Sequence, residues 1–201
     1  MSDKQNSRRA LSLVAGWTFA SSIGWAAGLT ASLVLILVAN KLPGLNEDRV
    51  FAYVTLILLG LTIGAAQWVV MRRYLAHPVR WLAATLVGHL LCLIVLVGGN
   101  LARLWVAEIW DDMLLLGLFG AAIGISQWWL LRQHYRNAGL WMLATAVGFL
   151  CFVWIVVDPA HSAVELVLRG TITGTLASIV PGMALVWMVR HLPSRWSISS
   201  S

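Results

Sequence analysis

Six long stretches without a single charged residue constrain this chain more than any other feature of its sequence. They run over residues 10–40, 50–71, 81–102, 113–131, 137–157 and 170–189. Each is close to or above the ~20 apolar residues that an α-helix needs to cross ~30 Å of hydrocarbon. A helix is also the single-segment structure that satisfies its own backbone hydrogen bonds without water. The sequence therefore predicts an all-α polytopic integral membrane protein with six transmembrane helices.

The composition excludes the common alternatives to a membrane protein. Apolar residues make up 60% of the 201 residues and charged residues 11%, with a mean hydropathy of +0.82, which excludes a water-soluble globule. Disordered chains are poor in aromatic residues, whereas this chain has twelve Trp. The net charge of +6 does not indicate nucleic acid as a partner, because the basic residues flank the apolar runs instead of gathering on one face.

The charges between the runs predict the orientation in the membrane, because Lys and Arg in short loops stay on the cytoplasmic side. The N-terminus and alternate segments carry Lys4, Arg8, Arg9, Arg72, Arg73, Arg80, Arg132, Arg136, Arg190 and Arg195. The intervening loops hold seven of the eight acidic residues, so one face is about +9 and the other about −3. We expect both termini in the cytoplasm and the chain in a bacterial inner (plasma) membrane.

An internal repeat divides the chain into three hairpins. The segment Trp-Leu-Ala-Ala-Thr-Leu-Val-Gly at 81–88 recurs as Trp-Met-Leu-Ala-Thr-Ala-Val-Gly at 141–148, and in a looser form at 17–24. The second helix of each hairpin reads Gly-x-x-x-Gly-x-x-Gln-Trp-x-x-x-Arg at 60–72 and again at 120–132. A degenerate copy at 178–190 has Leu and Val in place of Gln and Trp.

These copies predict one membrane domain, residues 1–201, of three tandem parallel two-helix repeats. The repeats span about 8–71, 72–131 and 132–190. Each hairpin enters and leaves on the same side, so we expect a pseudo-threefold axis along the membrane normal.

The repeated residues fall on one face of each helix. Helices in lipid associate through small residues that let backbones approach, aided by occasional side-chain hydrogen bonds. The predicted packing glycines are Gly24, Gly60, Gly64, Gly88, Gly120, Gly124, Gly148 and Gly182. We expect Gln67 to bond to Thr85 and Gln127 to Thr145 across neighbouring helices.

The two repeated elements resemble a group of uncharacterised bacterial multi-pass membrane proteins. The resemblance covers about two thirds of the chain, with Leu185 and Val186 departing from it in the last copy. It implies a helical membrane fold and no particular activity. In size and helix number the chain is also similar to the substrate-binding subunits of energy-coupling-factor vitamin transporters, although the threefold repeat argues against kinship.

Candidate ligand-binding side chains are Gln67, Gln127, His89, Thr85, Thr145, Pro181, Trp105 and Trp110. His89 either ligates a haem or chlorophyll metal or bonds to a neighbouring helix. The glutamines either line a polar constriction or only join helices. Trp105 and Trp110, in an acidic outer loop, belong either to a cation or solute site or to a turn resting at the interface.

Two further features have both a functional and a structural interpretation. Arg72, Arg132 and Arg190 form either an anion or lipid-headgroup site or ordinary positive-inside anchors. Pro181 removes a hydrogen bond to the carbonyl of Ala177 and should kink its helix, either at a transport site or as a structural kink. In the structural case we expect the hydroxyl of Ser178 or Thr175 to satisfy that carbonyl.

The expected function is non-enzymatic, since the chain has no phosphate loop and no Cys-x-x-Cys or His-Glu-x-x-His metal spacing. No Asp, Glu or Lys lies within a run, which disfavours ion-coupled pumping. We expect binding or facilitated passage of a small or lipophilic solute, with the chain acting as the membrane subunit of a transporter. The alternative is an accessory or assembly subunit that contacts pigments, lipids or partner proteins. The expected partner is the lipid bilayer; protein partners, a homo-oligomer and any cofactor are left open.

Overall fold

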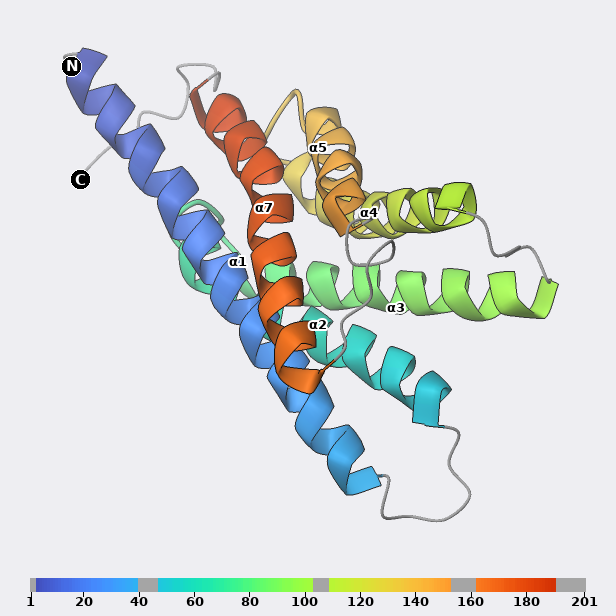
Figure 1. The fold of residues 1–201 in the computed structure, drawn as a ribbon. Helices are drawn as coiled ribbons and strands as arrows, with labels where there is room; N and C mark the ends of the chain where they lie inside the picture. Colours follow the sequence, from blue (N-terminus) through green and yellow to red (C-terminus); the bar gives the residue numbers. More distant parts are fainter. Residues whose placement is uncertain (1–2, 40–46, 103–108, 153–161, 191–201) are drawn as a thin grey trace.

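The computed structural model describes residues 3–39, 47–102, 109–152 and 162–190, and these form helices joined by short turns, with no strand. The elements are α1 (Asp3–Ala39), α2 (Glu47–Met71), α3 (Val79–Ala102), α4 (Ile109–Leu131), α5 (Gly139–Phe149) with the 3-10 turn η1 (Leu150–Phe152), and α7 (Ala163–Arg190) (Figure 1). The prediction of an all-helical protein is confirmed.

Within the described residues, five helices are long and apolar enough to span a membrane. Their apolar parts cover residues 10–39, 53–71, 79–98, 113–131 and 163–190. The predicted span at 137–157 is represented by the shorter apolar helix Gly139–Phe152. At ~1.5 Å per residue this part measures about 20 Å, and the rest of that span lies outside the described residues.

The two turns that join α2 to α3 and α4 to α5 have the same backbone hydrogen bonds, sixty positions apart. Leu75 N donates to Met71 O (3.0 Å), and Tyr135 N donates to Leu131 O (2.8 Å). In the first turn of the next helices, Trp81 N donates to Pro78 O (3.0 Å) and Trp141 N donates to Ala138 O (3.0 Å). Equal turns therefore give Trp81 and Trp141 equal positions in the first turns of α3 and α5.

The helices close into a ring. Each α-helix contacts the next one along the chain, and α7 packs against both α5 and α1. Figure 1 shows α7 crossing α1 while α2, α3 and α4 extend away from them. The first and last described helices therefore share a contact line, which we call a seam.

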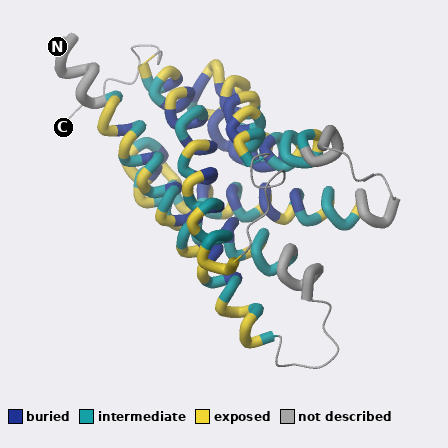
Figure 2. Tube along the Cα trace, in the orientation of Figure 1, coloured by how far each residue is buried: buried dark blue, intermediate teal, exposed yellow. Residues whose placement is uncertain are grey.

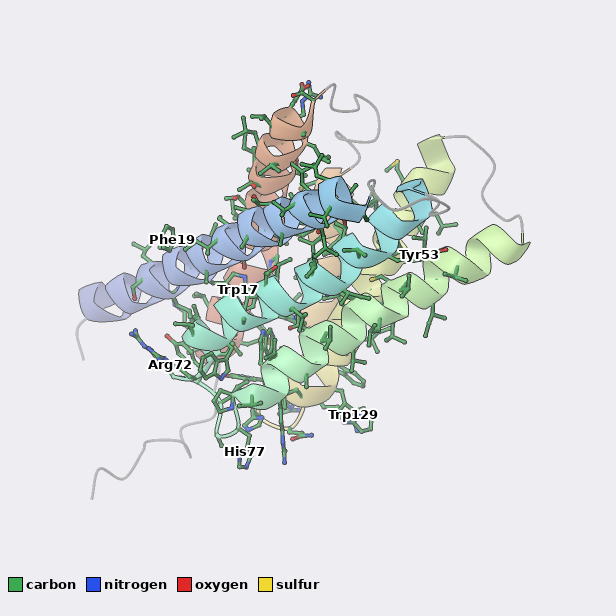
Figure 3. All side chains as sticks on the ribbon, turned by 90° about the horizontal axis from the view of Figure 1, so that it is seen from below. Trp17, Phe19, Tyr53, Arg72, His77 and Trp129 are labelled. Carbon is green, nitrogen blue, oxygen red and sulfur yellow. The ribbon has the colours of Figure 1, made fainter. Side chains whose placement is uncertain are left out.

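Buried residues gather in one part of this ring. No residue is buried in the segments 33–39, 53–58, 93–98, 113–118 and 162–169, as the teal and yellow helix ends in Figure 2 indicate. The unburied segments are the helix ends next to the acidic loops of the sequence. Packing is therefore tight toward the Arg72 end and loose toward the Tyr53 end; Figure 3 labels both residues, one near each end of α2.

The outside of the ring is apolar. Phe19, Ile94, Leu143 and Val164 are each more than 60% exposed, and Phe19 points away from the bundle in Figure 3. A soluble protein rarely shows so many large apolar side chains, so this surface suits contact with acyl chains.

α7 runs as one helix through Pro181. Each hydroxyl has a single proton, and Ser178 Oγ donates it to Thr175 O (2.7 Å) while Thr175 Oγ1 donates to Thr171 O (2.7 Å). The expectation that one of these hydroxyls satisfies the Ala177 carbonyl is therefore wrong. That carbonyl oxygen lies instead against Gly148 of α5, where there is no side chain to exclude it.

Candidate functional site

Three tryptophans meet inside the ring. Trp17, Trp81 and Trp141 come from the equivalent positions of α1, α3 and α5, and each is at most 1% exposed. Their ring centroids lie 5.3–5.7 Å apart with interplanar angles of 79–84°. The positive edge of one indole thus meets the negative face of another, which is the favoured aromatic arrangement. These three side chains, which we call the tryptophan triad, therefore pack against one another inside the ring.

Two glutamines hold two of these indoles. Trp81 Nε1 donates to Gln67 Oε1 (3.1 Å) and Trp141 Nε1 donates to Gln127 Oε1 (2.9 Å). Because an amide has both an acceptor and a donor, each glutamine also bonds to the first helix of its own hairpin: Gln67 Nε2 donates to Ser21 Oγ of α1 (3.0 Å). Each glutamine therefore joins three helices.

The hydroxyl partners predicted for the glutamines are wrong by one hairpin. Gln127 Nε2 donates to Thr85 Oγ1 (2.9 Å), so Thr85 serves Gln127 and not Gln67. Thr145 receives no described glutamine bond, and its hydroxyl donates to Trp141 O (2.8 Å). The prediction did not include the indole N–H donors on the following helix, although Gln67 and Trp81, and likewise Gln127 and Trp141, are fourteen residues apart in the sequence.

Leu185 leaves the third copy of this arrangement incomplete. It occupies the glutamine position on α7 and is fully buried. Trp17 Nε1 is a buried donor with no partner among the described residues, and so is Thr18 Oγ1 beside it. A buried polar group without a partner is uncommon in proteins and indicates strain or an unseen ligand.

A cavity of about 40 Å³, here called the axial cavity, lies inside the ring and borders Trp17 and Trp141 of the triad. Every described α-helix contributes to its wall, largely through equivalent positions of the repeat, such as Trp25, His89 and Phe149. Six of the eight predicted ligand-binding candidates line it, namely Gln67, Gln127, His89, Thr85, Thr145 and Pro181. The ligand-binding candidates predicted from the sequence did not include the wall residues Trp17, Trp25, Trp141 and Ser178.

The cavity wall carries amide, hydroxyl and imidazole groups among aromatic and aliphatic ones. His89, 3% exposed, bonds through Nδ1 to the Thr85 carbonyl of its own helix (2.9 Å), so the expected bond to a neighbouring helix is wrong. Over the described part of the chain, no group of three His, Cys, Asp or Glu side chains is placed to hold a metal ion. The arrangement suits neutral solutes better than ions.

All eight predicted packing glycines contact a neighbouring helix. A β-carbon on Gly24 would lie 2.6 Å from Ile63 Cα, and one on Gly88 would lie 2.7 Å from Ile123 Cα. The other six would meet side-chain or backbone atoms within 3.0 Å, namely Gly60, Gly64, Gly120, Gly124, Gly148 and Gly182. The absence of side chains at these positions lets the six helices approach closely enough to form the triad and the cavity.

We predict that Gly64→Leu prevents assembly of the ring. A β-carbon on Gly64 would stand 2.8 Å from Leu82 Cδ1 and 3.2 Å from Thr85 Cβ, and overpacking of this kind costs about 1–3 kcal/mol or more. Size-exclusion chromatography and thermal unfolding in detergent should show a lost or strongly destabilised monodisperse species. Gly98→Leu is the control, because nothing lies within 4 Å of a β-carbon there; equal melting of the two variants would contradict the packing.

The candidate arginines lie at helix ends and are exposed. The guanidinium carbon of Arg132 lies 3.9 Å from the ring centroid of Trp129 and 4.9 Å from that of Trp128, a cation–π arrangement with the last turn of α4. Nothing in the described contacts joins Arg132 to Arg72 or Arg190.

The two candidates from the acidic stretch 103–112 are only partly described. Trp105 lies outside the described residues, and Trp110 is described only as backbone of α4. The spacing of Glu165 and Arg169 predicts an ion pair at the start of α7. It is confirmed, with Arg169 Nη2 2.6 Å from Glu165 Oε1.

Comparison with known proteins finds no relative: no family model matches the chain, and no curated protein and no solved structure is significantly similar to it. A functional conclusion therefore rests on the geometry of the ring and its cavity.

Proposed function

We propose that the chain forms six transmembrane helices, as three parallel two-helix repeats around a pseudo-threefold axis. Three observations support this arrangement: the equal turns after α2 and α4, the mutual edge-to-face packing of three equivalent tryptophans, and a cavity walled by equivalent positions of every hairpin. In this arrangement α5 and the residues that follow it supply the sixth span.

The proposed setting is a bacterial inner membrane with both termini in the cytoplasm. The support is the distribution of charge, about +9 against −3, read through the positive-inside rule. The tryptophan triad then lies toward the cytoplasmic side of the axial cavity, and the loosely packed helix ends lie on the outer side.

The proposed function is the binding of a small neutral solute in the axial cavity, reached from the outer side. The observation that carries it is the cavity itself: polar groups from several helices converge on a space that they leave unfilled, at the centre of an otherwise close-packed ring. Passage into the cytoplasm would require the triad to part. In this proposal the chain acts as the membrane subunit of a transporter.

The size of the cavity limits the solute. A water molecule needs about 10–15 Å³ of this kind of space, so 40 Å³ holds a few water-sized groups. Pockets for drug-sized ligands measure about 300–1,000 Å³. A vitamin-sized lipophilic solute therefore does not fit the cavity in this conformation.

The second candidate function is that of an accessory or assembly subunit without a solute site. It is favoured by the small cavity, by the glycine-mediated packing and by aromatic side chains on the outside, where Trp129 is 58% exposed and Trp187 is 40% exposed. Partner proteins, pigments or a second copy of this chain would cover such side chains.

A test of solute binding compares the full chain with Ser178→Leu, which places an apolar group at a wall position that is 6% exposed. Leu176→Phe is the control, since Leu176 lies on the same helix and is 50% exposed. Native mass spectrometry should find a small molecule retained by the parent and the control. In light-scattering assays, short alcohols or amides should enter proteoliposomes of the parent and the control faster than proteoliposomes of Ser178→Leu.

If the chain is an accessory subunit, the same preparations should show no retained solute and no added permeability. A stoichiometric protein partner, together with parent vesicles no more permeable than Ser178→Leu vesicles, would contradict the solute-binding function.

A further inference from the structure

The third hairpin lacks an amide where the first two have one. At the seams of the first two hairpins, one glutamine accepts an indole N–H and donates to a hydroxyl of the preceding odd-numbered helix. In the third hairpin Leu185 stands at the glutamine position and packs in one cluster with Trp17. The repeat makes Trp17 the indole, and Thr145 the hydroxyl, that a glutamine at this position would serve. Leucine supplies the bulk of glutamine up to its Cδ and neither the oxygen nor the nitrogen beyond it.

Trp17 has a donor directed at this hairpin. It is 1% exposed, and its Nε1 has no partner among the described residues. A β-carbon on Gly182 would stand 3.0 Å from Trp17 Cδ1 and 3.8 Å from Nε1, so the pyrrole edge of the indole faces α7, one turn from Leu185. Leaving such a donor unpaired costs free energy that an acceptor in the cavity recovers.

Thr145 shows the complementary deficiency. Its hydroxyl proton goes to Trp141 O (2.8 Å), as that of Thr85 goes to Trp81 O (2.9 Å). Thr85 additionally accepts an N–H from Gln127, whereas Thr145 has no glutamine to accept from. Trp17 and Thr145 both line the axial cavity, so a residue with an unused donor and a residue with an unused acceptor border the same small space.

We propose that the axial cavity binds a neutral molecule with one acceptor and one donor, between the size of water and that of a short amide. Its oxygen accepts the Trp17 Nε1–H, and its own proton is donated to Thr145 Oγ1. The molecule stands in for the missing head group of a third glutamine. This inference rests on the proposed function and names the chemistry of its solute.

The surroundings select for a neutral molecule. His89 is the titratable group on the cavity wall, and its Nδ1 is engaged by the Thr85 carbonyl. The remaining polar groups are amides, hydroxyls and the indole N–H, which solvate a dipole and do not compensate a net charge.

The experiment follows the indole N–H groups of the full-length chain in nanodiscs by ¹⁵N-tryptophan NMR. Trp17→Phe identifies the Trp17 signal. Formamide is the probe, and xenon is the control for an apolar atom that fills space without accepting a hydrogen bond. Formamide should shift the Trp17 signal more than those of Trp81 and Trp141. Xenon should not cause the downfield shift of the Trp17 signal that a new hydrogen bond produces. A cross-peak between Trp17 N–H and water without formamide would identify water as the resident molecule.

Leu185→Gln and Leu185→Met separate this chemistry from cavity size. Both side chains are unbranched and similar in volume, but only glutamine brings the amide. Leu185→Gln should weaken the formamide response by about tenfold or more, as expected for a lost hydrogen-bonding site, and Leu185→Met should keep it. Two results would overturn the inference: equal formamide responses in the two variants, or a Trp17 signal that neither shifts with formamide nor shows a cross-peak to water.

The outcomes also separate this inference from the proposed function. Solute entry into vesicles that persists in Leu185→Gln would overturn the role of Trp17 and leave a solute-binding protein. A Trp17–water cross-peak in a protein that neither retains nor passes any solute would support the site chemistry and contradict the proposed function.

Discussion

Replacing Trp81 with alanine is expected to remove a large part of the stability of the bundle. Trp81 is fully buried, and deletions of this size in a core cost about 3–5 kcal/mol. The change also leaves Gln67 Oε1 without its indole donor, which adds about 0.6–2 kcal/mol for hydrogen bonds in membrane interiors. Against a total stability of about 5–15 kcal/mol, the variant should unfold at a much lower denaturant concentration or temperature.

Trp129→Ala is the matched control for this experiment. Trp129 is 58% exposed on the outside of the ring and meets Arg132, a contact worth about 0.5–1 kcal/mol at an exposed site. Chemical unfolding monitored by circular dichroism should separate the two variants by several kcal/mol. Similar losses would mean that the triad does not hold the ring together.

Gly148→Ala and Gly139→Ala are expected to change stability in opposite directions, although they are the same substitution in the same helix. At Gly148 the new β-carbon meets the carbonyl oxygen of Ala177, a backbone atom that cannot rotate away, so α5 and α7 must separate. At Gly139 nothing lies within 4 Å, and the exchange of glycine for alanine in a helix gains up to about 1 kcal/mol.

Thermal unfolding in one detergent measures both changes. We expect a loss of at least about 2 kcal/mol for Gly148→Ala, in the range found for overpacked cores, and a small gain for Gly139→Ala. A Gly148→Ala protein that melts with or above its parent would show that α5 and α7 do not touch at this point.

Much of the helical framework could be predicted from where the charges lie. Runs free of charge located five helices of membrane-spanning length because a charge within lipid is costly. The helices extend past these runs: α1 begins at Asp3 and α2 at Glu47, since polar residues near the interface can continue a helix. The glycine contacts were also predictable, because the small residues recur on one face.

The hydrogen-bond partners inside the ring could not be assigned in the same way. Placing Gln67 against Thr85 requires the rotation of each helix about its axis, and a face about 100° wide does not fix that rotation. The constant separation of fourteen residues from Gln67 to Trp81 and from Gln127 to Trp141 was the available signal for the indole donor to each glutamine. The volume of the cavity depends on side-chain positions to within an ångström and leaves no trace in the sequence.

The seam between α1 and α7 has a consequence for how the ribosome and the insertion machinery make this protein. α1 ends at Ala39 and α7 begins at Ala163, so about 120 residues are synthesised between them. At about 5–20 residues per second, the Trp17 and Trp25 side of α1 spends on the order of ten seconds in the bilayer without its final neighbour. During that interval a chaperone or lipid must cover the face of α1 that α7 later contacts. Insertion of α7 is therefore the step that completes folding.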